Sequence, residues 1–176
     1  MPNDQTQARP KGPGEANPAK LDPFFAQALG ALRYGLYFLT TGGFSGPRGM
    51  LVSWVGQVSG RPPLVQVAVR ENRPLLPDLQ DARAFALNIL PAGDDKLLAD
   101  LTRPAASRFA GIELQEGPLG LPLLAAGPGA LCCRVRETRQ PGDHMLFLGQ
   151  VEGAVWRGGG PSLEAGHGGH AYLGLS

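Results

Sequence analysis

The stretch Gly49-Met-Leu-Val-Ser-Trp-Val-Gly-Gln-Val-Ser59, followed by Arg61-Pro-Pro-Leu-Val-Gln-Val-Ala-Val-Arg70, contains two strand-like runs separated by a turn. In the first run, apolar side chains alternate with a set that includes Ser53 and Gln57, which is the period of a β-strand with one partly polar face. A sheet face of that kind can support a flat apolar ring and offer hydrogen bonds to a polar tail. We therefore predict one continuous strand over 49–59 and a second strand over 63–70.

Further apolar runs on both sides of this stretch extend the pattern. They predict strands over 36–42, 84–90, 130–138 and 144–156. Because the chain also contains 26 Gly and 17 Pro, it suits many short strands joined by turns better than long helices. We expect a mainly β protein: an antiparallel barrel with a few peripheral helices. No G-x-G-x-x-G motif stands between a strand and a helix, which disfavours a Rossmann fold.

Helix signals occur at three places. Asp22 and Pro23 suit an N-cap and a first helical position, and the apolar residues that follow at helical spacing predict a helix whose stripe packs on the barrel. A short helical turn is expected near Asn72, and acidic residues predict the start of a helix over 94–102. Residues 105–128 are expected to be irregular.

Composition limits the class of protein and its surroundings. The chain has 176 residues, 43% of them hydrophobic and 18% charged, with a formal net charge of +1, which predicts one soluble domain and gives no reason to expect nucleic acid. We expect a disordered arm over residues 1–20 and a single domain over 21–176. There is no run of membrane-spanning length and no apolar signal region, so we expect no membrane association and a cytoplasmic location.

Two adjacent cysteines and three histidines raise the question of a disulfide or a metal site. A disulfide between Cys132 and Cys133 would be strained on a strand, so we expect two free thiols in a reducing compartment. His144, His167 and His170 match no closed zinc spacing, and the cysteines lack C-x-x-C geometry. We therefore expect no metal.

The ordered set of runs resembles the flavin reductase-like family of FMN-binding split barrels, from about Phe24 to about Leu175. Phe85-Ala-Leu-Asn-Ile-Leu90 resembles the family's F-x-x-N-x-L strand, Arg108-Phe-Ala-Gly111 its R-F-x-G turn, and Gly142-Asp143-His144 its G-D-H motif. The run around Ser53-Trp54 also resembles the C-terminal reductase module of flavodiiron proteins. The resemblance implies an antiparallel, Greek-key FMN-binding split β-barrel and a homodimer with flavin clefts at its interface.

The resemblance and the local chemistry together suggest which residues hold FMN. Near the end of strand 63–70, arginine and asparagine side chains form a reasonable phosphate site, although a solvated turn with surface arginines is the alternative. By resemblance, the backbone from Met50 to Val55 lines the flavin ring and ribityl chain. The predicted cofactor-binding set is Met50, Leu51, Val52, Ser53, Trp54, Val55, Gln57, Ser59, Arg70, Asn72, Arg73 and Tyr172.

His144 is the candidate catalytic residue, because it opens a strand just after a tight turn and the family places this histidine near the flavin and the nicotinamide pocket. Hydride transfer needs alignment more than an acid or base, so we expect His144 to orient or hydrogen-bond the reactants. The alternative is a strand-end histidine that caps a backbone carbonyl. Trp54 is expected in the core, with contact to flavin or a dimer partner as the alternatives.

The resemblance implies an NAD(P)H-dependent FMN reductase, with NADH or NADPH as the electron donor and free flavin or a redox protein as the acceptor. One alternative is a flavoredoxin-like electron carrier that holds FMN without a productive nicotinamide site. Another is a split barrel that binds haem or a different ligand without redox turnover.

Overall fold

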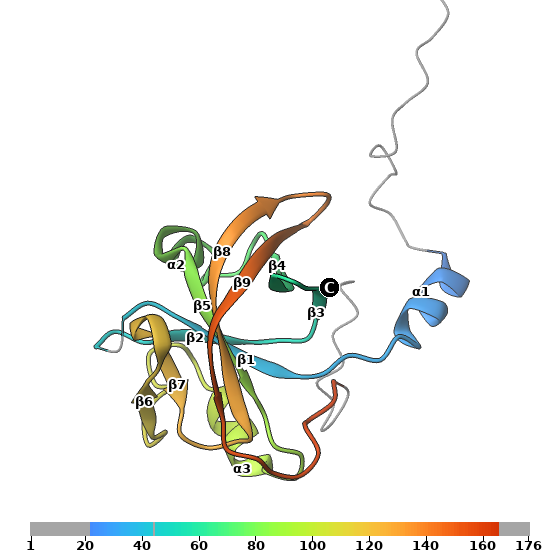
Figure 1. Cartoon of the computed structure of the whole chain (residues 1–176). Helices are drawn as coiled ribbons and strands as arrows, with labels where there is room; N and C mark the ends of the chain where they lie inside the picture. The colour runs from blue at the N-terminus through green and yellow to red at the C-terminus, as the bar shows by residue number, and fades with distance from the viewer. Residues whose placement is uncertain (1–21, 44, 166–176) are drawn as a thin grey trace, which may run out of the picture.

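Seven antiparallel strands form one sheet in the computed structural model, which describes residues 22–43 and 45–165. Neighbours across the sheet follow the order β2-β1-β5-β8-β9-β4-β3 (Figure 1). The strands are β1 (Tyr37–Thr41), β2 (Arg48–Val52), β3 (Val55–Gly60), β4 (Pro63–Arg70), β5 (Ala84–Ile89), β8 (Gly129–Arg139) and β9 (His144–Trp156). The mainly β, antiparallel prediction is confirmed, and five of the predicted strands match to within one or two residues.

The sheet curls because its two edge strands are consecutive in the chain. β2 ends at Val52 and β3 begins at Val55, so Ser53 and Trp54 alone connect opposite edges of the sheet. Three Cα–Cα steps cover at most about 11 Å, which brings the edges together at this point. The prediction of one continuous strand over 49–59 was wrong: its first half pairs with β1 and its second half with β4, so the ladder must break between them.

Successive residues of a strand pack into different hydrophobic clusters, one on each face of the sheet. On β1, Leu39 packs with Phe147 inside the curl, whereas Phe38 belongs to a second cluster on the outer face with Leu101. Both faces of the central strands are therefore covered. On β8, Cys132 and Cys133 face opposite sides and are fully buried.

The two thiols are free, as predicted. Burial raises the pKa of Cys132 to about 11 and, with smaller electrostatic contributions, that of Cys133 to about 12. Because the thiolate is the reactive form, both side chains act as small apolar core residues at neutral pH.

The outer face of the sheet is covered by α3 (Asp95–Leu101), a 3₁₀ turn (Pro118–Gly120) and the hairpin of β6 (Leu114–Glu116) with β7 (Pro122–Leu124). The prediction that residues 105–128 are irregular was wrong over this hairpin. Buried polar groups of the sheet hold it: Asn88 accepts from the Leu124 amide at 2.8 Å, and Thr40 donates to the Pro122 carbonyl at 2.5 Å. These long-range bonds have no local signature in the sequence.

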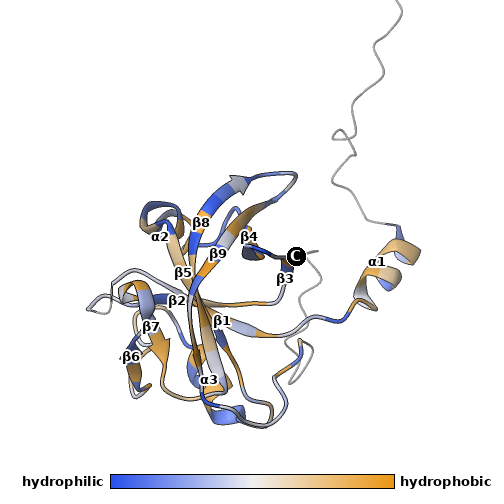
Figure 2. Ribbon diagram, viewed as in Figure 1, coloured by the Kyte–Doolittle hydropathy of each residue, from blue (hydrophilic) through white to orange (hydrophobic). Residues whose placement is uncertain are grey.

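The first helix does not pack as expected. α1 (Pro23–Gly30) begins at the Asp22 N-cap, as predicted, but it buries no residue and stands away from the sheet (Figure 1). Phe24 is 77% and Phe25 63% exposed, and Figure 2 shows the apolar colour of this helix beside no other element. Backbone bonds of Tyr34 and Leu36 to residues 163–165 fix where the chain leaves the sheet, so the short helix points outward.

The remaining helix, α2 (Leu76–Ala82), starts four residues later than the turn expected near Asn72. Leu76 and Leu79 are buried and add to the inner core. Within the described ranges, no helix is long and apolar enough to cross a membrane.

Candidate functional site

A charged pair at the start of β9 fixes the orientation of the His144 ring. Its Nδ1 lies 2.7 Å from Oδ1 of Asp143, and the other oxygen of that carboxylate lies 3.5 Å from Nε of Arg70. The hydrogen bond from His144 is the largest of the causes that lower the pKa of Asp143, with the charges of His144 and Arg70 adding to it. Because Asp143 is ionised, Nδ1 must donate to it, and this fixes the orientation of the ring.

The face of the same imidazole is covered by an aromatic ring. Trp54 stacks on His144 with ring centroids 4.5 Å apart and planes at 29°, and Tyr34 lies 6.3 Å beyond Trp54 at 36°. His144 is consequently only 5% exposed. Trp54 was predicted in the core, but it is half-buried, belongs to none of the core clusters and packs against the candidate catalytic residue instead.

A second group of polar side chains surrounds a cavity of about 300 Å³, which we call the arginine pocket. Its lining includes Arg48, Arg73 and Arg108 together with the apolar side chains Met50 and Leu51. Among the described residues that line it there is no Asp or Glu. A lining of this kind, with fixed cations next to apolar surface, is suited to an organic anion.

Arg108 is fixed within this pocket by backbone carbonyls. Its guanidinium donates to the carbonyl of Gly49 on β2 and, at 3.1 Å, to that of Arg103. Burial, followed by the neighbouring charge of Arg48, lowers the pKa of Arg108. Arg48 in turn pairs with Asp78 at 3.0 Å. The two guanidiniums therefore lie close enough to repel each other, and a bound anion would relieve that repulsion.

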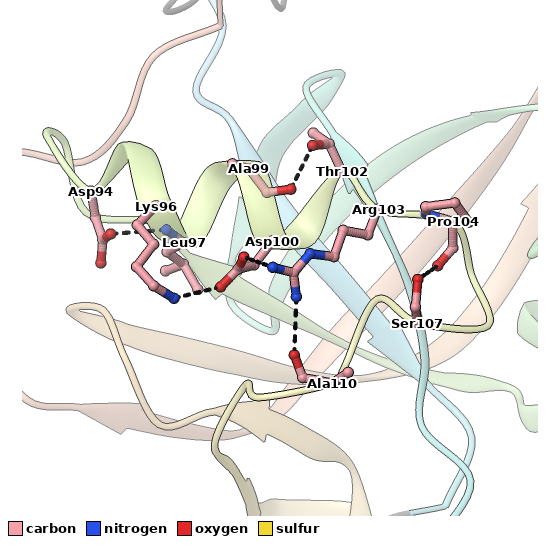
Figure 3. A network of polar contacts seen from close by, with 10 residues as sticks. All are labelled: Asp94, Lys96, Leu97, Ala99, Asp100, Thr102, Arg103, Pro104, Ser107 and Ala110. Carbon is pink, nitrogen blue, oxygen red and sulfur yellow. Dashed lines mark hydrogen bonds and ion pairs between the residues drawn. The ribbon is translucent and has the colours of Figure 1, made fainter.

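The loop that carries Arg108 is tied to α3 by the network in Figure 3. Asp100 accepts from Lys96 at 2.9 Å and from Arg103 at 2.6 Å, and Arg103 also donates to the carbonyl of Ala110 at 3.1 Å. The Lys96 hydrogen bond is the largest of the causes that lower the pKa of Asp100. Arg103 thus links α3 to the R-F-x-G turn (residues 108–111). This link helps to hold Arg108 against β2.

The structure divides the predicted cofactor-binding residues among three places. Met50, Leu51 and Arg73 line the arginine pocket, and Trp54 and Arg70 lie with His144. Val55 and Gln57 line a separate, mostly apolar cavity of about 350 Å³ near Tyr37 and Leu87.

The other predicted residues lie apart from these groups. Val52 and Ser53 are buried, at 5% exposure each, and Val52 packs in the inner core. Asn72 is exposed and Ser59 half-buried on β3. Tyr172, like His167 and His170, lies outside the described residues. Within the described ranges, no group of His, Cys, Asp and Glu gathers for a metal.

The structure separates the two arginines that were predicted to form one phosphate site. Arg70 and Arg73 were predicted together, but Arg70 pairs with Asp143 whereas Arg73 lines the arginine pocket. Sequence reasoning did not assign Arg48 or Arg108 to the site. The R-F-x-G motif was the available signal for Arg108, while nothing in the sequence distinguishes Arg48 from a surface arginine.

The residues present suit FMN. The arginine pocket offers guanidiniums for a phosphate and apolar side chains for the start of a ring system. From Leu51 to Trp54 the chain advances three residues, which span at most about 11 Å. The same stretch therefore leads from the pocket to His144, and the segment from Arg70 to Arg73 connects the two groups a second time.

Comparisons with known proteins place the chain in a family. The model of the flavin reductase like domain matches residues 29–170. The FMN reductase (NADH) of Agrobacterium fabrum is 32% identical over 145 residues, covering 81% of each chain. Diflavin flavoprotein A 1 of Synechocystis is 36% identical over 135 residues, which are 74% of this chain and 24% of that protein. The chain thus spans about a quarter of that relative.

Comparison with solved structures supports the same family. The NADH:FAD oxidoreductase of Streptomyces globisporus superposes with a TM-score of 0.70 at 31% identity, covering 80% of this chain and 89% of that one. Since the family model spans most of the chain and the similar proteins share both sequence and fold, the chain belongs to the flavin reductase-like family.

Proposed function

We propose that this protein is an NAD(P)H-dependent flavin reductase that binds FMN between the arginine pocket and His144. One observation carries the proposal: the stretch from Arg48 to Trp54 connects these two groups. It begins at the pocket that three arginines line and ends at the side chain that stacks on His144. FMN, when bound, supplies a ring that accepts hydride from a nicotinamide. The named relatives that act on flavin with NADH support this reading.

Each group of residues has a part in this function. Arg48, Arg73 and Arg108 hold the phosphate through charge-assisted hydrogen bonds, and Met50 and Leu51 cover apolar surface of the ligand. Asp143, oriented by Arg70, keeps the Nδ1 proton of His144 directed at its carboxylate. The orientation of the imidazole is thereby fixed, so that His144 can align a nicotinamide against the flavin.

The experiment is a flavin titration followed by reduction. The purified protein should bind FMN more tightly than riboflavin, because riboflavin lacks the phosphate, and the yellow complex should bleach with NADH or NADPH without air. A protein that binds neither flavin would overturn the proposal.

A second candidate function, that of an FMN electron carrier, is favoured by one observation. Trp54 covers His144, which is 5% exposed, so a nicotinamide has no direct access to the imidazole in this conformation. A carrier needs only flavin and a redox partner. Flavin that bleaches with dithionite but with neither nicotinamide would select the carrier. Free flavin and a redox protein are the two acceptors that we propose for the reduced cofactor.

We also propose a homodimer, supported by α1. An eight-residue helix with Phe24, Phe25 and Leu29 exposed, and with no buried residue, has its apolar face available to a second copy. Light scattering should give twice the chain mass, and Phe25→Glu should shift the protein toward the monomer. The matched control is Val58→Glu, which adds the same charge at an exposed apolar position on β3. A wild-type monomer would contradict this assignment.

The buried, free thiols of Cys132 and Cys133 support the further proposal of a reducing, cytoplasmic location.

A further inference from the structure

Two arginines of the arginine pocket carry like charges that repel each other. Burial, followed by the charge of Arg48, lowers the pKa of Arg108, so the two guanidiniums are close enough to interact. Arg108 is fixed, because it donates to the backbone carbonyls of Gly49 and Arg103. The side chain of Arg48 is 48% exposed, and repulsion therefore drives it toward solvent unless another group holds it.

Asp78 is the group that holds Arg48. Its Oδ2 lies 3.0 Å from Nη2 of Arg48, and the residue stands in the first turn of α2, outside the lining of the arginine pocket. Because Leu76 and Leu79 of the same helix are buried, the carboxylate is presented by a packed element. A guanidinium has five N–H donors, so a single carboxylate at Nη2 does not use them all.

The pair matters more for the position of Arg48 than for the stability of the fold. Both side chains are partly exposed, at 48% and 36%, and an exposed ion pair contributes little to stability. A long side chain that is ordered before the ligand arrives, however, lowers the entropy cost of binding. The Arg48–Asp78 pair is thus suited to prepare an anion site.

We propose that Asp78 is a positioning residue for the flavin phosphate: it holds Arg48 beside Arg108, so that FMN meets two guanidiniums already in place. This inference rests on the proposed function, because it takes the phosphate of FMN as the anion in the arginine pocket. Asp78 also repels that phosphate, since both are negative. Water and salt screen this repulsion, whereas the contact with Arg48 is direct, so positioning has the larger effect.

Two substitutions at Asp78 separate the hydrogen bond from the charge. Asp78→Asn removes the charge but keeps an oxygen that accepts from Arg48, whereas Asp78→Ala removes both. The Kd for FMN should therefore be about two- to tenfold higher in Asp78→Ala than in Asp78→Asn, the scale of ordering one long side chain. Riboflavin has no phosphate and should bind equally to the two variants. Quenching of flavin fluorescence measures each Kd.

A double-mutant cycle with Arg48→Ala tests whether Asp78 acts through Arg48. With Arg48 present, Asp78→Ala loses both the positioning and the repulsion; with Arg48→Ala, it loses the repulsion alone. The factor by which Asp78→Ala raises the Kd for FMN should therefore be about two- to tenfold greater when Arg48 is present. Equal factors, or a smaller one with Arg48 present, would overturn the inference, because Asp78 would then be irrelevant or a competitor of the phosphate.

Glu152→Ala is the matched control. Glu152 pairs with Arg134 at the same distance of 3.0 Å, and Arg134 is 47% exposed, close to the value for Arg48. Neither residue lines the arginine pocket. The control also removes one carboxylate from an exposed pair, and it should leave the Kd for FMN unchanged.

The outcomes separate this inference from the proposed function. Equal losses of FMN and riboflavin affinity in Asp78→Ala would show that Asp78 supports the fold, and would overturn the inference alone. A wild type that binds FMN no more tightly than riboflavin would overturn the phosphate assignment and this inference with it. A wild type that binds FMN through the arginines but bleaches with neither NADH nor NADPH would overturn the reductase, whereas the cycle would still support Asp78.

Discussion

The carboxylate of Asp143 lies 2.7 Å from Nδ1 of its neighbour His144, and the ring so fixed is stacked against Trp54. Consecutive residues of a regular strand point to opposite faces, so this contact depends on Asp143 standing in the turn before β9 begins. The Gly-Asp-His motif thus places a carboxylate and an imidazole side by side at the start of β9, an interior strand of the curled sheet.

His144→Gln tests the part assigned to that ring. The variant should fold and retain FMN, while anaerobic reduction by NADH or NADPH should slow by roughly 10–100-fold, the scale of one lost positioning contact. Stopped-flow bleaching of the flavin band gives the rate. Dithionite reduction is the control and should stay complete. A wild-type rate in the variant would remove His144 from the site, and a colourless variant would move it to the flavin-binding residues.

Arg73→Ala tests the arginine pocket as the phosphate site. A hydrogen bond to a charged group contributes about 1.5–3 kcal/mol, so the Kd for FMN should rise by roughly 10–100-fold and that for riboflavin much less. Arg136→Ala is the matched control, because Arg136 lies on β8 and bonds to Gln150. Equal losses for the two flavins would show that Arg73 supports the fold and not the phosphate.

Asp143→Asn tests the ion pair through its pH dependence. Because the folded protein lowers the pKa of Asp143, the pair adds stability at pH values above the ordinary range of Asp, near pH 4, and this is lost as pH falls through the lowered value. The difference in Tm between wild type and variant should therefore shrink as the solution is acidified from neutral pH. A difference that stays constant with pH would contradict the assignment.

Arg83→Gly tests a local strain in the fold. Arg83 ends α2 in the left-handed conformation, with φ of 52°, which costs a residue other than glycine about 1–2 kcal/mol. Glycine loses more backbone entropy, so we expect a net gain of about 0.5–1 kcal/mol in the free energy of unfolding. Urea denaturation measures it, and a loss of stability would show that the Arg83 side chain makes a larger contribution.

Local patterns predicted the strands and both capped helices because their causes are local. Alternation of apolar side chains sets a strand's faces, and Asp22 and Asp94 cap their helices through bonds to amides two or three residues later. The break at Ser53-Trp54 arises because the two halves of the run over 49–59 pair with different strands. That is a long-range property, and the alternation continues through the break without marking it.

The candidate site was predicted in part for the same reason. The G-D-H and R-F-x-G motifs indicated the turns that carry His144 and Arg108, but the residues that contact these two side chains include some that lie far away in sequence. Arg108 reaches Gly49 across 59 residues, and the stack of Trp54 on His144 joins positions 90 apart. Adjacency in sequence also misled: Arg70 and Arg73 are three residues apart and yet belong to different groups.

The measurement that tests the proposed function most directly is stopped-flow reduction of the FMN-loaded wild type by NADH, compared with NADH deuterated at the transferred position. If this protein passes hydride from nicotinamide to flavin, the flavin band should bleach in a single turnover without air, and deuterium should slow the bleaching. The same pair of traces should be recorded with NADPH. A yellow protein that binds FMN but bleaches with neither donor, while dithionite reduces it fully, would contradict the reductase and leave the electron carrier in its place.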